Sequence, residues 1–376
     1  MRLKNHPKAG EVWSWSGWVI ESCGLEEAIE RGARAIGWQE KRQAVPGNVQ
    51  AGAKGKARGI GMGYMMHVSG ARPMLHETSS AIVKINEDGG ANLIYSNSDC
   101  GQGCATALTQ VAAEELGLNY EDVIITKVSD TDVSGFDIGS HASRQTYSGG
   151  NAVRRASNAA KIQLLAMAAE ILEVEPEELV IEKGVIKSTK QPEKSISVAE
   201  VSHKAHFGSH GHQIIGVVSE EPPGNPPVYA AQFAEVEVDT ETGVIEVIKI
   251  AAAHDVGTVI NPTVVEGQIQ GALQQGIGYA LMEEYRYDLQ TGRPLNAGLT
   301  DYKILTAADM PQIETILVEA ACETGPFGAK SVGESGLVAT AAAISNAVYN
   351  AIGIRFTELP ITPEKVLAAL QARSEQ

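Results

Sequence analysis

Aromatic side chains, cysteines and basic charge are scarce in this sequence. Of its 376 residues, 5% are aromatic and four are cysteines, and 46 Asp and Glu outnumber 30 Lys and Arg, for a formal charge of −16. This acidic excess argues against a nucleic-acid partner and against an anionic membrane surface. No apolar run approaches 18 residues and the first residues lack the apolar core of a signal peptide, so we expect a cytoplasmic protein.

Metal-binding patterns of the usual kinds are also lacking. The cysteines form no Cys-x-x-Cys pair, which excludes a zinc ribbon or an iron–sulfur cluster ligated by this chain alone, and we expect reduced thiols. A group of histidines within ten residues matches no standard ligand spacing, and we favour a solvated loop over a metal site. The cysteines are Cys23, Cys100, Cys104 and Cys322, and the histidines are His203, His206, His210 and His212.

The chain contains two stretches with the same order of predicted elements. Each has a strand hairpin around a glycine-containing turn, then a polar loop and a helix. We therefore predict a mixed α+β fold of two related subdomains, each a hairpin sheet with packed helices, with a cleft between their loops. The predicted divisions are a docking segment and linker at 1–58, a first subdomain at 59–205, a connector at 206–227 and a second subdomain at 228–376.

Residues 1–24 hold three of the four tryptophans. They are Trp13, Trp15 and Trp18, in a stretch too short for a core of its own. Clustered indoles usually pack on something, so we expect docking onto another part of the chain or onto another chain.

Small polar residues precede three predicted helices. In the Gly101-Gln102-Gly103 loop, glycine allows close approach to a ligand, although a plain turn is an equally simple interpretation. Ser143, Arg144 and Gln145 offer a clamp for a pyrophosphate, but Arg144 alone is as typical of a surface ion pair.

Two further polar residues occur in apolar surroundings. Gln268 lies in or near a glycine-rich helix, where a buried amide needs a partner and a structural role is the alternative. Glu334 lies in GPFGAKSVGESGL at 325–337, ahead of an Ala-rich helix. It is either a carboxylate at a helix start or a general base beside a ligand. Without a Gly-x-Ser-x-Gly elbow or a dinucleotide or P-loop glycine pattern, the residues point to a bound phosphate-bearing cofactor.

Four motifs in order resemble the xanthine oxidase (molybdenum hydroxylase) family. They are GQGCATALTQVAAEELGL, DTDVSGFDIGSHASRQTYSGGNAV, INPTVVEGQIQGALQQGIGYALMEE and GAKSVGE. The resemblance covers the C-terminal half of the family's molybdopterin-binding subunit. The chain is similar to the smaller molybdopterin chain of split enzymes such as nicotinate dehydrogenase, which implies a missing half on a separate chain or one removed from this chain.

The resemblance implies roles for individual residues. Glu334 resembles the family's general base, with Gln268 and Gln102 beside the metal's oxygen ligands or the pterin. Molybdenum would be held by the pterin dithiolene, without protein ligands. The residues implied in binding molybdopterin, expected as the cytosine dinucleotide, are Gly101, Gln102, Gly103, Thr106, Ser143, Arg144, Gln145, Gln268, Lys330, Ser331, Val332 and Gly333.

The same resemblance implies an activity and partners. The expected reaction is the hydroxylation of an N-heteroaromatic or aldehyde substrate with oxygen from water. The expected partners are the N-terminal half of the molybdopterin subunit, a [2Fe-2S] subunit and an FAD subunit, assembled as a dimer of heteromers. The alternatives are an aromatic acyl-thioester reductase of the same family and a non-catalytic assembly subunit.

Overall fold

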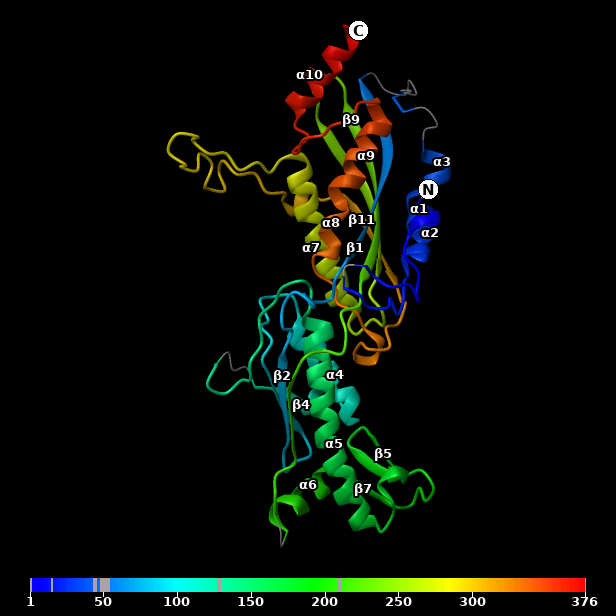
Figure 1. The fold of residues 1–376 in the computed structure, drawn as a ribbon, viewed down its shortest axis with the longest axis vertical. Coiled ribbons are helices and arrows are strands. Elements are labelled where there is room, and N and C mark those ends of the chain that lie inside the picture. Colours follow the sequence, from blue (N-terminus) through cyan, green and yellow to red (C-terminus); the bar gives the residue numbers. More distant parts are fainter. Residues whose placement is uncertain are drawn as a thin grey trace.

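The structure, a computed structural model, describes residues 2–14, 16–42, 46–47, 55–126, 130–208 and 211–375. Two units follow one another along the long axis of the molecule (Figure 1). Trp15 and His210, which the sequence singled out, lie outside the described residues.

Helices and strands are mixed throughout the chain. The helices are α1 (Arg2–Asn5), α2 (Leu25–Ile36), α3 (Trp38–Lys41), α4 (Cys104–Leu116), α5 (Gly150–Leu172), α6 (Val198–Phe207), α7 (Pro262–Leu281), α8 (Ser335–Val338), α9 (Thr340–Ile352) and α10 (Pro363–Ser374). The strands are β1 (Lys56–His67), β2 (Ser79–Ile85), β3 (Ala91–Tyr95), β4 (Val123–Ile125), β5 (Leu179–Glu182), β6 (Val185–Ser188), β7 (Ser195–Ser197), β8 (Ile215–Glu220), β9 (Val228–Asp239), β10 (Ile245–Asp255) and β11 (Gln312–Val318).

The two larger sheets have the same topology. Their strand orders are β8-β2-β3-β4 and β1-β9-β10-β11, and each contains an antiparallel hairpin, a parallel strand on one side and an antiparallel strand on the other. In both units a helix, α4 or α7, connects the hairpin to the parallel strand, and a second helix, α5 or α9, follows later in the chain. The expected mixed fold with two related hairpin-sheet units is confirmed.

Two strands lie in a different unit from the one that the predicted boundaries assign. We placed β1 in the first unit, but it pairs with β9 over its whole length, from Lys56 opposite Asp239 to His67 opposite Val228. β8, which we placed in the connector, pairs with β2 and completes the first sheet. The boundaries at 59 and 206 therefore need correction. A strand pattern in a sequence does not specify its partner, because sheet pairing is a long-range contact.

Glycines in the outer strands bring the long helices directly onto the sheets. A Cβ at Gly61 of β1 would lie 2.1 Å from the backbone nitrogen of Ala347 in α9. A Cβ at Gly216 of β8 would lie 1.9 Å from the carbonyl oxygen of Ala156 in α5. Only glycine permits these approaches, so the two units use the same packing device.

The N-terminal segment covers the other face of the second sheet. Leu25 and Ile29 of α2 share a buried apolar cluster with Phe233 of β9. The ring of Trp38 meets that of Phe233 edge to face at 5.6 Å between centroids. The Arg72 guanidinium lies 5.2 Å from the Trp18 ring centroid. The described part of this segment therefore docks onto its own chain.

The histidines near residue 206 occupy separate environments. Nδ1 of His206 lies 2.8 Å from a carboxylate oxygen of Glu87, and the ring of His203 packs on Phe207. In the described ranges, no three His, Cys, Asp or Glu side chains are grouped so that they could hold a metal ion. None of the described helices has both the length and the apolar character needed to cross a bilayer.

Candidate cofactor-binding site

Four loops meet around one cavity of about 280 Å³. In the first unit they are the segment 100–104 ahead of α4 and the segment 140–146 ahead of α5. In the second they are the segment 256–265 at the start of α7 and the segment 330–334 ahead of α8 and α9. Corresponding loops of the two related units thus face each other across the cavity.

Most of the residues singled out in the sequence line this cavity. Gly101 and Thr106 are the two members of the predicted set that do not line it. The predicted residues that do are Gln102, Gly103, Ser143, Arg144, Gln145, Gln268, Lys330, Ser331, Val332, Gly333 and Glu334.

The loop ahead of α4 is held in shape by Asp99. Its carboxylate accepts hydrogen bonds from the backbone N–H groups of Gly101 and Ala105, at 2.8 and 2.9 Å. Burial acts to raise the pKa of Asp99, but the backbone donors, including Gly103, outweigh burial and lower it. Gly103 has φ of +80°, and a Cβ there would lie 2.9 Å from Val264 of α7, so glycine lets the two units approach closely.

The Gln102 amide is folded back onto its own loop. Its oxygen accepts from the N–H of Cys100 at 2.7 Å, and its nitrogen donates to the carbonyl of Ser98 at 2.8 Å. One N–H and one lone pair remain for a ligand. By contrast, the Gln268 amide on α7 lines the cavity and has no hydrogen-bond partner within the described chain.

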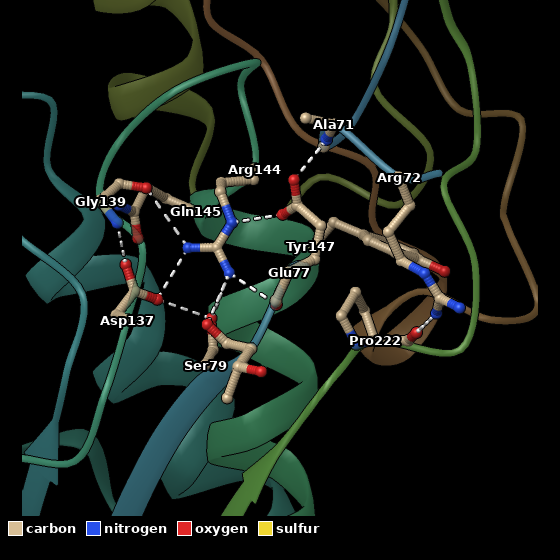
Figure 2. Close-up of polar contacts among 12 residues, drawn as sticks. Ala71, Arg72, Glu77, Ser79, Asp137, Gly139, Arg144, Gln145, Tyr147 and Pro222 are labelled. Carbon is tan, nitrogen blue, oxygen red and sulfur yellow. Dashed lines mark hydrogen bonds and ion pairs between the residues drawn. The ribbon is translucent and has the colours of Figure 1, made fainter. Parts of the chain in front are cut away.

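Arg144 has different partners from those that a pyrophosphate clamp would need. Its side chain is fully buried, and its guanidinium donates to the carboxylates of Glu77 at 2.5 Å and Asp137 at 2.7 Å (Figure 2). Further bonds reach the Ser79 hydroxyl and the Gly139 carbonyl. The guanidinium also donates to the backbone carbonyls of Glu77 and Thr78. All five of its N–H groups therefore have acceptors within the protein. The side chain therefore holds the 137–145 loop against β2.

Lys330 and Ser331 are also turned toward protein partners. The Lys330 ammonium lies 2.8 Å from a carboxylate oxygen of Asp255, and both side chains are fully buried. The Ser331 hydroxyl accepts from the N–H of Tyr147 at 2.9 Å. These two residues line the cavity while their side chains fasten the 330–334 loop to the rest of the protein.

Glu334 faces the corresponding loop of the other unit. One of its carboxylate oxygens accepts from the Ser143 hydroxyl, whose oxygen in turn accepts from the Glu334 N–H at 3.0 Å. Nε2 of His67 lies 3.4 Å from the same carboxylate oxygen. The contact with His67 lowers the pKa of Glu334 to about 2; burial opposes this shift, and the Ser143 hydrogen bond adds to it.

Ser143 and its neighbour have a strained backbone. Ala142 and Ser143 have φ of 47° and 53°, in the left-handed region that residues other than glycine rarely adopt. A Cβ at Gly333 would lie 2.7 Å from the Ser143 oxygen, so this glycine allows the two loops to touch. The strain and the glycine together place Ser143 against Glu334.

Sequence reasoning missed two residues that support the Glu334 loop. Gln232 on β9 is fully buried, donates to the carbonyl of Gly336 at 2.6 Å and accepts from the Thr340 hydroxyl at 2.7 Å. A lone Gln in the apolar run VYAAQFAEV was an available signal for this role. His67 ends a predicted strand, and no local pattern marks it as a neighbour of Glu334.

The cavity offers groups that suit a polar, phosphate-bearing ligand. α4 and α7 begin at its wall, and helix N-termini favour anions. The Asn261 side chain caps α7 by accepting from the N–H of Val264 at 3.0 Å. Nε2 of His141, another lining residue, is buried with no partner among the described residues. These donors and the Gln268 amide fit the heteroatoms of a pterin.

Comparison with known proteins decides the family. The model of the molybdopterin cofactor-binding domain matches residues 31–311. The chain belongs to the molybdopterin cofactor-binding domain family. The resemblance to the xanthine oxidase family is confirmed, since relatives of this domain include xanthine dehydrogenase.

Similar molybdopterin cofactor-binding chains act on several compounds. The xanthine dehydrogenase molybdenum-binding subunit of Escherichia coli O157:H7 is 34% identical over 97% of this chain and 48% of its own length. The nicotine 6-hydroxylase large subunit of Paenarthrobacter nicotinovorans is 33% identical over 81% of this chain and 38% of its own length. The structure of quinoline 2-oxidoreductase from Pseudomonas putida 86 matches with a TM-score of 0.86 and 29% identity, over 94% of this chain and 47% of that one. The chain thus spans between 38% and 48% of the length of these relatives.

Proposed function

We propose that this chain is the C-terminal half of the molybdopterin-binding catalytic subunit of a molybdenum hydroxylase. The observation that carries the proposal is the cavity that Gln102, Gln268 and Glu334 line together, in a chain whose residues 31–311 match the molybdopterin cofactor-binding domain. The Gln268 amide and part of the Glu334 carboxylate are free to meet a ligand.

The cofactor is held by the loops and helix starts around the cavity. The residues 330–334, with Gly103 and the N-terminus of α7, bind the pterin and its phosphate, and Gln268 and Gln102 donate to its oxygen atoms. Arg144 contributes indirectly, because it holds the loop that carries Ser143. When bound, molybdopterin supplies the molybdenum that takes up the two electrons of the oxidation. The proposed form of the cofactor is molybdopterin cytosine dinucleotide.

Glu334 is the general base of the reaction. Its carboxylate oxygen accepts the proton from the water-derived nucleophile, and Ser143 fixes the direction in which the carboxylate points. A carboxylate with a pKa of about 2 is a weak base, but 45% of this side chain is exposed here. Cover by substrate, cofactor and partner raises the pKa of a carboxyl toward the range that general-base catalysis needs.

The substrate class is an N-heteroaromatic compound or an aldehyde. Relatives named for xanthine, nicotine and quinoline support the first, and the molybdenum-binding subunit of an Escherichia coli aldehyde oxidoreductase, 32% identical, supports the second. These names describe oxidative enzymes and do not favour an acyl-thioester reductase.

The proposed partners are a chain equivalent to the rest of the relatives' length, a [2Fe-2S] subunit and an FAD subunit. Among the described residues no three Cys, His, Asp or Glu side chains are grouped so that they could hold a metal, and the proposal therefore places the electron carriers on other chains. An arm between α7 and β11 projects from the second unit (Figure 1). It exposes Leu289 and Leu299 at 97% and 77%, which supports cover by another chain.

Replacement of the base tests this function. In the assembled enzyme, Glu334→Gln should lower turnover about 10²–10⁴-fold, the usual contribution of a general base, with molybdenum and pterin content unchanged. Glu323→Gln, a change outside the cavity lining, is the matched control and should retain activity. Full turnover in Glu334→Gln would refute the assignment of the base. A complex without molybdenum would favour the non-catalytic assembly subunit.

A further inference from the structure

Three segments distant in the sequence converge on one oxygen of Glu334. His67 ends β1, Ser143 lies ahead of α5, and Glu334 precedes α8. Nε2 of His67 is 3.4 Å from Oε2 of Glu334, and the Ser143 hydroxyl donates to the same oxygen. The carboxylate is therefore held from two sides, by a residue of each unit.

The environment of His67 directs its ring toward Glu334. The side chain is 24% exposed, but its Nε2 atom is buried and makes no well-aligned hydrogen bond in the described structure. Val228 of β9 is its partner in the sheet. Of the helices that pack on β1, α8 carries no titratable side chain, and α9 carries Tyr349, whose ring lies against Arg355. The helix α3 carries Glu40 and Lys41, and Lys41 pairs with Glu235. The contact at 3.4 Å is thus a charge contact, and it strengthens when the imidazole is protonated.

The other titratable groups of the cavity are engaged elsewhere or make no contact with this carboxylate. Arg144 is bound to Glu77 and Asp137, and Lys330 is bound to Asp255. Burial raises the pKa of Cys104 to about 12, so this thiol is neutral. Cys100 and His141 also line the cavity, and neither contacts Glu334 among the interactions of the described residues.

We propose that His67 is a positioning residue for Glu334: its imidazole and the Ser143 hydroxyl hold the same carboxylate oxygen, one from each unit. This inference rests on the proposed role of Glu334 as the base. It adds a residue that lies outside the sequence motifs to the surroundings of the base.

The low pKa of Glu334 agrees with this geometry, because His67 is its largest cause. Loss of the imidazolium should let the carboxyl group bind a proton at higher pH. A base that is protonated cannot accept a proton, so the acid limb of kcat/KM against pH should move to higher pH in a variant without His67. A cation at the same position should restore the wild-type limb.

The first experiment uses infrared difference spectroscopy on the full chain and does not depend on turnover. The signal of Glu334 is isolated by subtracting the spectrum of Glu334→Gln. Between pH 6 and 4 the wild-type carboxylate band should stay constant, whereas in His67→Gln it should be replaced by the band of a protonated carboxyl group. A Glu334 signal that titrates identically in wild type and His67→Gln would overturn the proposal.

The second experiment measures kcat/KM against pH in the assembled enzyme. His67→Gln should shift the acid limb upward by about one pH unit or more, and His67→Lys should return it toward wild type. His76→Gln is the matched control, because His76 is 96% exposed and pairs with Glu221. Coincident profiles of His67→Gln and wild type would refute the role of His67 while the proposed function stands. Full activity of Glu334→Gln would refute that function, and the infrared result would still decide whether the two side chains are coupled.

Discussion

The loops ahead of α5 and α9 occupy equivalent places in the two units, yet they differ in how much of their charge is exposed. The first buries its charged side chain, Arg144, completely among Glu77, Asp137 and backbone carbonyls. The second buries Lys330 against Asp255 but leaves 45% of Glu334 exposed beside the cavity. A buried charge whose hydrogen bonds are all made inside the protein is costly to unpair, whereas a partly exposed charge remains available to a ligand.

Removal of Arg144 should have the largest effect on stability. Arg144→Ala leaves two buried carboxylates without their partner, which should lower the free energy of unfolding by about 3–5 kcal/mol. Denaturant unfolding of the full chain measures this change. Arg155→Ala removes an ion pair with Glu220 at the surface and should change stability by less than about 1 kcal/mol. Equal losses of unfolding free energy in Arg144→Ala and Arg155→Ala would contradict the distinction between a buried and an exposed charge.

Removal of Gln232 should have an intermediate effect. Gln232→Ala leaves the Gly336 carbonyl and the Thr340 hydroxyl without their buried partner, for a loss of about 1–3 kcal/mol. The same unfolding measurement applies. Gln232→Glu separates size from hydrogen bonding, since it keeps the acceptor and removes the donor. If both variants are as stable as wild type, the hydrogen bonds of Gln232 to Gly336 and Thr340 do not stabilise the Glu334 loop.

Glu334→Gln should lower stability only slightly, and in a pH-dependent way. Because the pKa of Glu334 is lowered from 4.5 to about 2 in the folded chain, its carboxylate contributes stability above pH 4.5 and loses this contribution as the pH falls toward 2. Exposure limits the effect to below about 1 kcal/mol. The difference between variant and wild type, measured by unfolding at pH 6 and pH 4, should shrink at the lower pH. A difference that grows in acid would contradict the sign of the shift.

Gln268→Ala should have the smallest effect on stability. Its amide has no hydrogen-bond partner in the described chain, so the change should remain within about 0.5 kcal/mol. Cofactor retention in the assembled enzyme should fall, since Gln268 lines the cavity. If the chain unfolds as readily as in Gln232→Ala, Gln268 is a structural residue.

Local motifs predicted which residues line the cavity better than they predicted what those residues contact. Gln102 and Glu334 were found because they stand in glycine-rich loops ahead of helices, and Gln268 because it stands in a glycine-rich helix; all three line the cavity. The pairing of Arg144 with Glu77 was missed because Glu77 is 67 residues away, a separation at which sequence patterns carry no information. The roles of the lining residues remain predictions.

The same limit applies to the fold. Hairpins and helices could be predicted from apolar periodicity, and the related order of the two units from their repetition. The pairing of β1 with the second sheet and of β8 with the first could not, because each strand has the same local pattern in either sheet. His67 reaches Glu334 only because β1 belongs to the second sheet, since it lies at the end of β1.

The most direct test of the central claim is the molybdenum content of the complex that purifies with this chain. The test co-expresses the tagged chain with a chain equivalent to the other half of its relatives. The purified complex should contain one molybdenum per copy of this chain. Denaturation should release a pterin phosphate. A stable complex with that partner that contains neither metal nor pterin would contradict the claim that these four loops form a molybdopterin site.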